Sequence, residues 1–225
     1  MGVAFDLADK YRAVVHMIVD GNMGQMMETA ELPPMRELPK EPPKWAVTGA
    51  KGRKPNFLSS IYIDPVEQEV TNLRLLKRWL EIEKNEVRFA ESNLEDAEIA
   101  VIGFGTSGRV ASSAIRIARE EGIKVGLLRP ITLAPFPEKR LEEISKQVRR
   151  ILVIEMNSGM MLDDVNRVVQ GRVPVEFYGR MGGITPLPDE ILDEIRRVAT
   201  NQMPVNGDAR QQWITRLEKI VGGQA

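Results

Sequence analysis

The sequence contains no cysteine and one histidine among its 225 residues. The lack of cysteine excludes disulfides, thiolate zinc sites and cysteine-ligated iron–sulfur clusters within this chain, so any electron relay has to lie on another subunit. The one histidine, His16, stands in the apolar stretch AVVHMIVDG, which predicts a buried strand with a hydrogen-bonded core histidine. Histidine-based catalytic triads and zinc sites are therefore not expected.

The sequence also lacks a strong net charge and a long apolar run. Its 31 basic and 32 acidic residues leave a formal charge of −1, which produces no general field for nucleic acid or an anionic membrane. No stretch approaches the roughly 18 consecutive apolar residues of a membrane span, and the N-terminus lacks a basic segment followed by an apolar one. With 43% hydrophobic residues to form a core, we expect a globular, cytoplasmic protein without nucleic-acid or membrane partners.

The first 63 residues predict the end of one domain followed by a linker. Helical spacing in FDLADKYRA leads directly into the strand-like VVHMIVDG and a glycine-rich turn that ends at Gly24. One helix and one strand cannot form a core, so residues 1–31 are predicted to be the closing unit, or remnant, of a second α/β domain. Five prolines between Leu32 and Lys44 disfavour helix, so residues 32–63 are predicted to be an extended linker.

Residues 64–96 are predicted to form a connecting helix and an extended segment. Asp64 can cap the helix, Pro65 suits its first position, and Glu67 can complete a capping box. The helix carries apolar residues at the three-and-four spacing that packs against a neighbour. These residues are Val66, Val70, Leu73, Leu76, Trp79 and Leu80.

From residue 97 to residue 200, apolar strands and amphipathic helices alternate without a break. The strand-like segments are IAVIGFG, KVGLLRPI, RILVIEM and PVEFYG. Continuous apolar strands between amphipathic helices predict an α/β fold, with three α/β/α layers around a mostly parallel sheet and right-handed crossovers. Residues 201–225 are predicted to form a tail helix that packs on this domain, with Trp213, Leu217 and Ile220 on one side and Gly222 at its end.

The glycine turn after the first of these strands admits two interpretations. Gly103, Gly105 and Gly108 have the G-x-G-x-x-G spacing that holds pyrophosphate in dinucleotide-binding proteins. Such a site also needs an acidic residue about 20 positions later, and none occurs between positions 122 and 137, although Arg129 is available for a 2′-phosphate. We therefore favour a tight turn, in which the second and third glycines avoid collision with neighbouring backbone. The start of the following helix can still bind an anion.

Six polar residues at the ends of predicted strands are candidates for a ligand cleft, because ligands of open α/β sheets bind at the carboxyl ends of strands. They are Asp20, Asn22, Arg129, Glu155, Asn157 and Arg180. Each has an alternative structural role: the first pair can form a turn, the Glu155–Asn157 pair can shape another, and both arginines can form ion pairs. No catalytic residue is assigned, and Asp163 and Asp164 are attributed to the first turn of a helix, with no metal.

Four motifs resemble a known family. The segment IAVIGFGTSGRVASSAIRIAREEGIKVGLLRPITLAPFP resembles the C-terminal domain of transketolase-like, thiamine-diphosphate-dependent enzymes. Together with DGNMGQMMETAELP, EMNSGMMLDDVNRVV and VEFYGRMGGITPLPDEIL, it resembles the alpha subunit of the 2-oxoacid:ferredoxin oxidoreductases of the branched-chain, 2-oxoisovalerate type, from about Phe5 to Val198. Met160 stands where this family usually has glutamine, and the Y-P-I-T-P-type segment of the family's N-terminal, thiamine-enclosing domain is missing.

The resemblance implies a subunit, fragment or split-gene form of an enzyme that oxidatively decarboxylates a 2-oxoacid to acyl-CoA. It implies thiamine diphosphate, magnesium and [4Fe-4S] clusters in the assembled enzyme and coenzyme A as co-substrate, with none of them bound by this chain alone. The implied partners are thiamine-binding beta, gamma and cluster-bearing subunits, ferredoxin through the complex, and dimer contacts. The chain itself is expected to serve structure, assembly and cleft formation.

Three further interpretations remain open beside the resemblance. The glycine turn allows a nicotinamide-dinucleotide-binding oxidoreductase domain, for which micromolar binding of NADH or NADPH is expected. A domain that has lost its cofactor-binding part can also act as a non-catalytic assembly module. Lys51, Arg53 and Lys54 form a basic turn that is either solvated or a contact for coenzyme A phosphates or an acidic ferredoxin.

Overall fold

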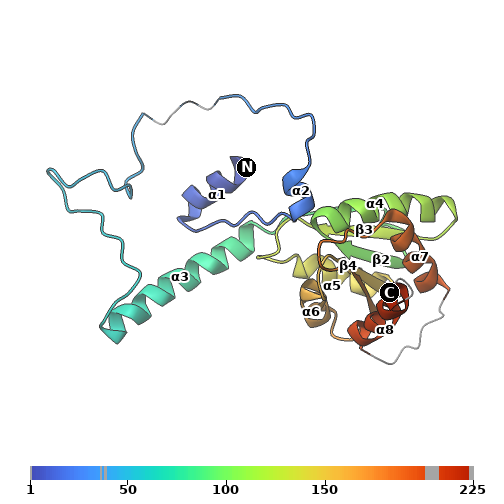
Figure 1. Ribbon diagram of the computed structural model, residues 1–225. Helices are drawn as coiled ribbons and strands as arrows, with labels where there is room; N and C mark the ends of the chain where they lie inside the picture. Colours follow the sequence, from blue (N-terminus) through green and yellow to red (C-terminus); the bar gives the residue numbers. More distant parts are fainter. Residues whose placement is uncertain (1, 36, 38–39, 201–207, 223–225) are drawn as a thin grey trace. The chain divides into compact units, whose positions relative to one another are not determined.

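A computed structural model describes residues 2–35, 37, 40–200 and 208–222 of the chain. The chain divides into two compact units, one made of residues 1–25 and 82–225 and the other of residues 26–81. The first unit contains the sheet and most of the helices (Figure 1). None of the described helices is long and apolar enough to cross a membrane.

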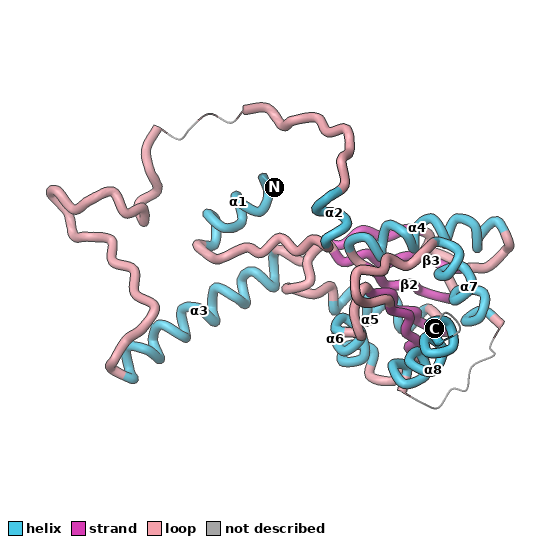
Figure 2. The backbone as a smooth tube through the Cα atoms, in the orientation of Figure 1, coloured by secondary structure: helices cyan, strands magenta, loops and turns pink. Residues whose placement is uncertain are grey.

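The first unit contains a five-stranded sheet with the strand order β1-β3-β2-β4-β5. Figure 2 shows strands in magenta among the cyan helices of this unit. The strands are β1 (Phe89–Ser92), β2 (Ile99–Gly103), β3 (Val125–Pro130), β4 (Arg150–Glu155) and β5 (Val175–Gly179). The last four are parallel, and Ile102 of β2 lies opposite Leu128 of β3 and Val153 of β4. The predicted mostly parallel α/β sheet is confirmed. The antiparallel strand β1, which pairs with β3, was predicted only as part of an extended segment.

Helices cover both faces of this sheet. They are α4 (Gly105–Glu120), α5 (Glu138–Gln147), α6 (Met160–Val169) and α7 (Pro188–Ala199). Helices α4 and α7 pack together on one face, and α5 and α6 pack together on the other (Figure 1). This division follows from the strand order, because the chain moves one way from β2 to β3 and the opposite way from β3 to β4 and β5, while each crossover stays right-handed.

Helix α8 (Ala209–Gly222) packs on β5, as predicted for the tail helix. The Trp213 side chain is 1% exposed and meets the ring of Phe177 edge-on, with 5.0 Å between the ring centroids. Its indole Nε1 donates a hydrogen bond to the Gly179 carbonyl at 2.9 Å. Leu217 is partly buried against the core, whereas Ile220 is 43% exposed. The helix is therefore held to the sheet by this aromatic side chain together with Arg216, whose Nη2 donates a hydrogen bond to the Phe177 carbonyl at 2.9 Å.

The N-terminal residues differ in part from the prediction. Helix α1 (Gly2–Tyr11) forms as expected. The predicted strand VVHMIVDG, residues 14–21, is wrong: this segment belongs to no strand, and His16 is exposed instead of buried. The physical reason is that a strand needs a hydrogen-bonded neighbour, and no described residue pairs with this segment in a ladder. The predicted glycine-rich turn contains one helical turn, α2 (Gly21–Gln25).

Helix α1 is anchored by a buried carboxylate. Lys10 Nζ and Tyr11 Oη each donate a hydrogen bond to Glu86 Oε1 at 2.7 Å, and Arg88 Nη2 donates to Oε2 at 3.0 Å. The Lys10 ammonium, followed by the Tyr11 hydroxyl and the Arg88 guanidinium, lowers the pKa of Glu86 from 4.5 to about 2. These bonds therefore hold the end of α1 against the residues before β1.

This depressed pKa predicts a loss of stability in acid. Because the folded pKa lies below the unfolded value, the Glu86 contacts contribute fully above about pH 4.5 and are lost as the pH falls through about 2. Thermal melting followed by circular dichroism should show a larger fall in Tm between pH 5 and pH 2.5 for the wild type than for Glu86→Gln. The same pH dependence in both proteins would contradict this assignment.

The second unit is mostly irregular. Among the described residues from 26 to 64, none lies in a helix or strand. Helix α3 (Pro65–Asn85) begins in this unit, and Asp64 Oδ1 caps it by accepting hydrogen bonds from the amides of Val66 at 2.8 Å and Glu67 at 3.0 Å. The capped helix is confirmed. Every member of its predicted apolar stripe, however, is exposed.

Candidate functional site

The carboxyl ends of the parallel strands bring most of the predicted site residues to one edge of the sheet. Glu155 ends β4, Asn157 follows it, and Arg180 directly follows β5. Asp20 and Asn22 also reach this edge through side-chain hydrogen bonds from Thr106 to Asp20 and from Asn22 to Thr185. The edge where ligands of such sheets bind is therefore also a contact between the N-terminal segment and the sheet domain.

The side chain of Asp20 is hydrogen-bonded to the first turn of α4. Its carboxylate accepts hydrogen bonds from Thr106 Oγ1 at 2.5 Å and from the Met23 amide at 2.8 Å. The Thr106 hydroxyl, followed by the Met23 amide, lowers the pKa of Asp20 below its usual value. A carboxylate of this chain therefore lies where the pyrophosphate of a dinucleotide would bind. This arrangement argues against the nicotinamide interpretation of the glycine turn.

The glycines of the turn serve different purposes. A Cβ on Gly108 would lie 2.6 Å from the Gly103 carbonyl oxygen and about 3.0 Å from the Arg129 side chain, so Gly108 is required by close packing, as predicted. The collision predicted for Gly105 is wrong, because a Cβ there would meet nothing within 4 Å. Gly105 instead has a φ of +53°, a left-handed conformation that glycine adopts without strain.

This packing predicts the effect of a single methyl group. We expect Gly108→Ala to lower the free energy of unfolding by about 1–3 kcal/mol, because the backbone oxygen of Gly103 cannot move away freely. Urea denaturation of both proteins measures this change. Gly122→Ala is a control with open space around it but a positive φ, so it reports backbone strain without collision. A Gly108→Ala protein of wild-type stability that had lost affinity for NADH would instead indicate a pyrophosphate site.

The side chains of Glu155 and Asn157 accept hydrogen bonds from backbone amides at the start of α6. The fully buried carboxylate of Glu155 accepts hydrogen bonds from the amides of Met161 and Leu162, each at 2.9 Å, and from Asn157 Nδ2 at 3.0 Å. Asn157 Oδ1 in turn accepts hydrogen bonds from the Gly159 amide at 2.7 Å and from the Met160 amide at 2.9 Å. Burial raises the pKa of Glu155 above its usual value, although these hydrogen bonds oppose the shift.

This arrangement corresponds to the turn-shaping alternative for both residues. Buried side chains whose polar atoms are bonded to the adjacent helix satisfy amides that would otherwise lack partners. The Met160 amide is one of the amides bonded in this way, and the Met160 side chain itself is exposed. Its thioether therefore faces solvent rather than a polar partner within the domain.

The two candidate arginines have different environments. Arg180 is 12% exposed, and its Nη1 lies 3.4 Å from Glu190 Oε1. Beside this pair, burial and then the Glu190 carboxylate raise the pKa of Tyr178 to about 12. Arg129 is exposed, its stem lies against Gly108, and it forms no ion pair with residues that the structure describes. The ion-pair alternative therefore describes Arg180 and does not describe Arg129.

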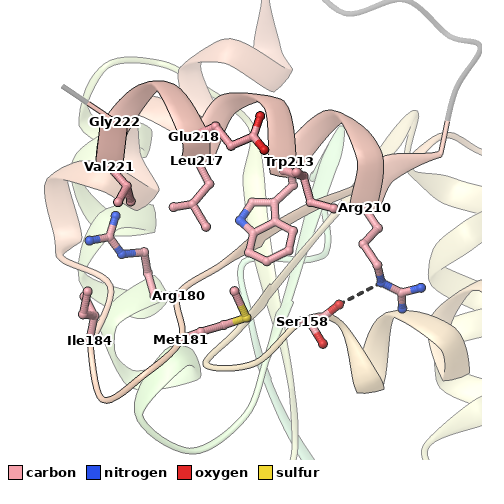
Figure 3. A pocket seen from close by; sticks show the side chains of 11 residues that line it. Ser158, Arg180, Met181, Ile184, Arg210, Trp213, Leu217, Glu218, Val221 and Gly222 are labelled. Atoms are coloured by element: carbon pink, nitrogen blue, oxygen red, sulfur yellow. Dashed lines mark hydrogen bonds between the residues drawn. The ribbon is translucent and has the colours of Figure 1, made fainter. Parts of the chain in front are cut away.

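A cavity of about 760 Å³ lies between α8 and the loop that follows β5 (Figure 3). Apolar side chains supply most of its wall: Met181, Ile184, Trp213, Ile214, Leu217 and Val221. Polar or charged side chains from Ser158, Arg180, Arg210 and Glu218 also line it. Nothing in the sequence pattern predicted this cavity, because the loop and the helix that form it are about 30 residues apart.

The other charged candidates are engaged locally. Asp163 forms an ion pair with Arg210 at 2.9 Å, and Asp164 lies 3.5 Å from Arg167. In the basic turn, Arg53 donates hydrogen bonds to the Lys54 carbonyl at 2.9 Å and to Thr48 Oγ1 at 3.0 Å. Within the described ranges, no group of three or more histidine, cysteine or acidic residues is placed to hold a metal ion.

Comparison with known proteins gives a consistent result. Residues 97–191 match the family described as pyruvate:ferredoxin oxidoreductase core domain II. The chain is 43% identical over 196 residues to the ketoisovalerate oxidoreductase subunit VorB of Methanothermobacter thermautotrophicus. It is 30% identical over 220 residues to the 2-oxoglutarate synthase subunit KorA of Methanothermobacter marburgensis. These alignments cover 87% and 85% of this chain, but only 55% and 58% of the relatives.

A solved structure shares the fold. It is described as 2-oxoglutarate:ferredoxin oxidoreductase from Magnetococcus marinus with 2-oxoglutarate, coenzyme A and succinyl-CoA bound. It superposes with a TM-score of 0.50 at 18% sequence identity, and the match covers 60% of this chain and 24% of that chain. The chain thus spans little more than half the length of the curated relatives and a smaller part of this structure.

Proposed function

Because the chain belongs to the 2-oxoacid:ferredoxin oxidoreductase family, as a homologue of the VorB alpha subunit, we propose that it is one component of such a multi-subunit enzyme. The assembled enzyme would oxidatively decarboxylate a branched-chain 2-oxoacid to acyl-CoA and pass electrons to ferredoxin. Its partners would be a thiamine-binding beta subunit, a gamma subunit and a cluster-bearing subunit. The homology over 87% of the chain is the observation that carries this proposal.

We propose that this chain by itself binds none of the cofactors of that reaction. The sequence has no cysteine to ligate a [4Fe-4S] cluster, and Glu155 and Asn157 are bonded to α6 instead of facing an open cleft. Thiamine diphosphate, magnesium and the clusters would therefore be held by other parts of the assembly. The contribution of this chain would be structural: the contacts of Asp20 and Asn22 join its N-terminal segment to the edge of the sheet.

The exposed apolar side chains of α3 support an assembled state. Val66, Val70, Leu73 and Leu76 are each more than half exposed, and they repeat at the spacing that forms one face of a helix. An exposed row of apolar side chains along one side of a helix is typical of a protein–protein contact. We therefore expect this face to contact other subunits of the same enzyme.

Co-purification tests the proposed function. A tagged chain, co-expressed with beta and cluster-bearing subunits of a VorB-type enzyme, should retain both subunits through gentle purification. Addition of an N-terminal thiamine-enclosing domain in trans should restore ferredoxin-linked 2-oxoacid oxidation. Isolation of the chain without either subunit would contradict the proposal, and retention without any activity would indicate a non-catalytic assembly module.

A matched pair of variants tests the α3 face separately. Leu73→Gln with Leu76→Gln should weaken retention of the partner subunits, because it removes two apolar side chains from the exposed stripe. Glu67→Gln with Arg74→Gln introduces the same side chains at two exposed positions on another side of the helix and should leave retention unchanged. Equal retention in both variants would place the contact elsewhere on the chain.

A further inference from the structure

The cavity beside α8 combines an apolar wall with one incompletely bonded cation. Along the wall, the rings and aliphatic chains of Trp213, Leu217, Ile184 and Met181 lie around one space (Figure 3). The indole N–H of Trp213 is directed to the Gly179 carbonyl, so the ring has no donor left for a ligand. Such a surface favours the hydrocarbon part of a ligand over a strongly hydrated one.

The two arginines of the cavity differ in their remaining hydrogen-bonding capacity. Arg210 is engaged, because it donates to the carbonyls of Ser158 and Gly159 at 2.8 Å and to Asp163 at 2.9 Å. Arg180 uses Nη1, which is buried, for its ion pair with Glu190 at 3.4 Å, whereas its Nε and Nη2 donate to no residue that the structure describes. A guanidinium has five N–H donors, so Arg180 has donors available for an anion.

From this combination we propose that the cavity binds an aliphatic monocarboxylate, with its carboxylate on Arg180 and its hydrocarbon chain against Trp213 and Leu217. A volume of about 760 Å³ lies within the range of small-ligand sites, so an eight-carbon chain fits it. The acidic side chain at the cavity, Glu218, is exposed, and solvent therefore screens its repulsion of the ligand. The site goes beyond the proposed function, because every residue that lines it belongs to this chain.

The tryptophan in the wall provides a direct measurement. The chain has three tryptophans, so Trp45→Phe with Trp79→Phe leaves Trp213 as the one tryptophan reporter in the full chain. Titration with octanoate should change its fluorescence saturably, whereas 1-octanol of the same chain length should bind about tenfold more weakly, the effect of losing one charged hydrogen-bonding partner. Equal affinity for the two compounds, or no response to octanoate, would overturn the proposal.

Two variants test whether Arg180 supplies the positive charge that binds the carboxylate. Arg180→Gln should weaken octanoate about tenfold and leave 1-octanol unchanged, because it removes the guanidinium and keeps a polar side chain. Lys219→Gln removes the same charge from an exposed position of α8 that does not line the cavity, and should change neither affinity. An equal loss of octanoate affinity in both variants would contradict the proposal, because binding would then depend only on the net charge of the chain.

A third variant tests the proposal even if the Arg180→Gln protein does not fold. Glu218→Lys adds a cation to the cavity at an exposed position, so it should tighten octanoate by about threefold at low salt without affecting 1-octanol. Unchanged octanoate affinity in this variant would contradict an anion in the cavity. If the cavity is instead a contact for another polypeptide, octanoate should leave Trp213 unaffected, which overturns the proposal in the same way.

Discussion

Replacement of Glu155 by alanine is expected to lower the free energy of unfolding by about 2–5 kcal/mol, one of the two largest effects predicted for this chain. The change removes the acceptor for the amides of Met161 and Leu162, which lie in the buried first turn of α6. It also removes the partner of Asn157 Nδ2. Each buried donor left without an acceptor costs about 1–3 kcal/mol. Urea denaturation followed by circular dichroism measures the difference.

Two further variants separate the hydrogen bonds of Glu155 from its charge. Glu155→Gln keeps the volume and one acceptor oxygen, so its loss of stability should be about half that of Glu155→Ala. Asp164→Ala removes an exposed carboxylate from the first turns of the same helix and should change stability by less than about 0.5 kcal/mol. A Glu155→Ala protein as stable as Asp164→Ala would show that α6 does not depend on the buried carboxylate.

Replacement of Trp213 by alanine is expected to cost about 3–5 kcal/mol, the range for removal of a fully buried aromatic side chain. The change removes the edge-on contact with Phe177 and the hydrogen bond to Gly179, two of the contacts that hold α8 against β5. The tail helix should then become sensitive to limited proteolysis before the sheet domain unfolds. Mass spectrometry of the first cleavage products identifies where the chain is cut.

Another tryptophan of the same chain provides the control. Trp79 on α3 is 39% exposed, so Trp79→Ala should change stability by much less than Trp213→Ala. Trp213→Phe keeps an aromatic ring and loses only the indole N–H, which should cost about 1–2 kcal/mol. Equal effects of the two alanine variants would contradict the assignment of Trp213 as an anchor of α8.

Residues 97–200 show which structural features sequence patterns can predict. Their strands and helices appear in the predicted order, because a continuous apolar run or a three-and-four apolar spacing is a property of neighbouring residues. The same reasoning failed for residues 14–21, where the apolar run is present but no described strand pairs with it. It also missed the short strand Phe89–Ser92, whose assignment depends on pairing with Leu127–Pro130.

The sequence indicated where the candidate site residues lie better than it indicated their hydrogen bonds. The rule that ligands bind at carboxyl ends of strands correctly placed Glu155, Asn157 and Arg180 at one edge. It did not predict that Glu155 caps α6, nor that Asp20 bonds to a residue 86 positions away. The cavity beside α8 has no signal in the sequence, since it forms only where Trp213 and Ile184 come together.

The sequence by itself therefore determined the α/β class, the order of elements in the sheet domain and the absence of cysteine-based chemistry, because these depend on composition and local spacing. The tertiary structure alone decided which polar groups are bonded to which, whether an extended segment is paired, and where a cavity remains. These features depend on contacts between residues far apart in the chain. Such contacts are selected by the packing of the whole fold, which local periodicity does not encode.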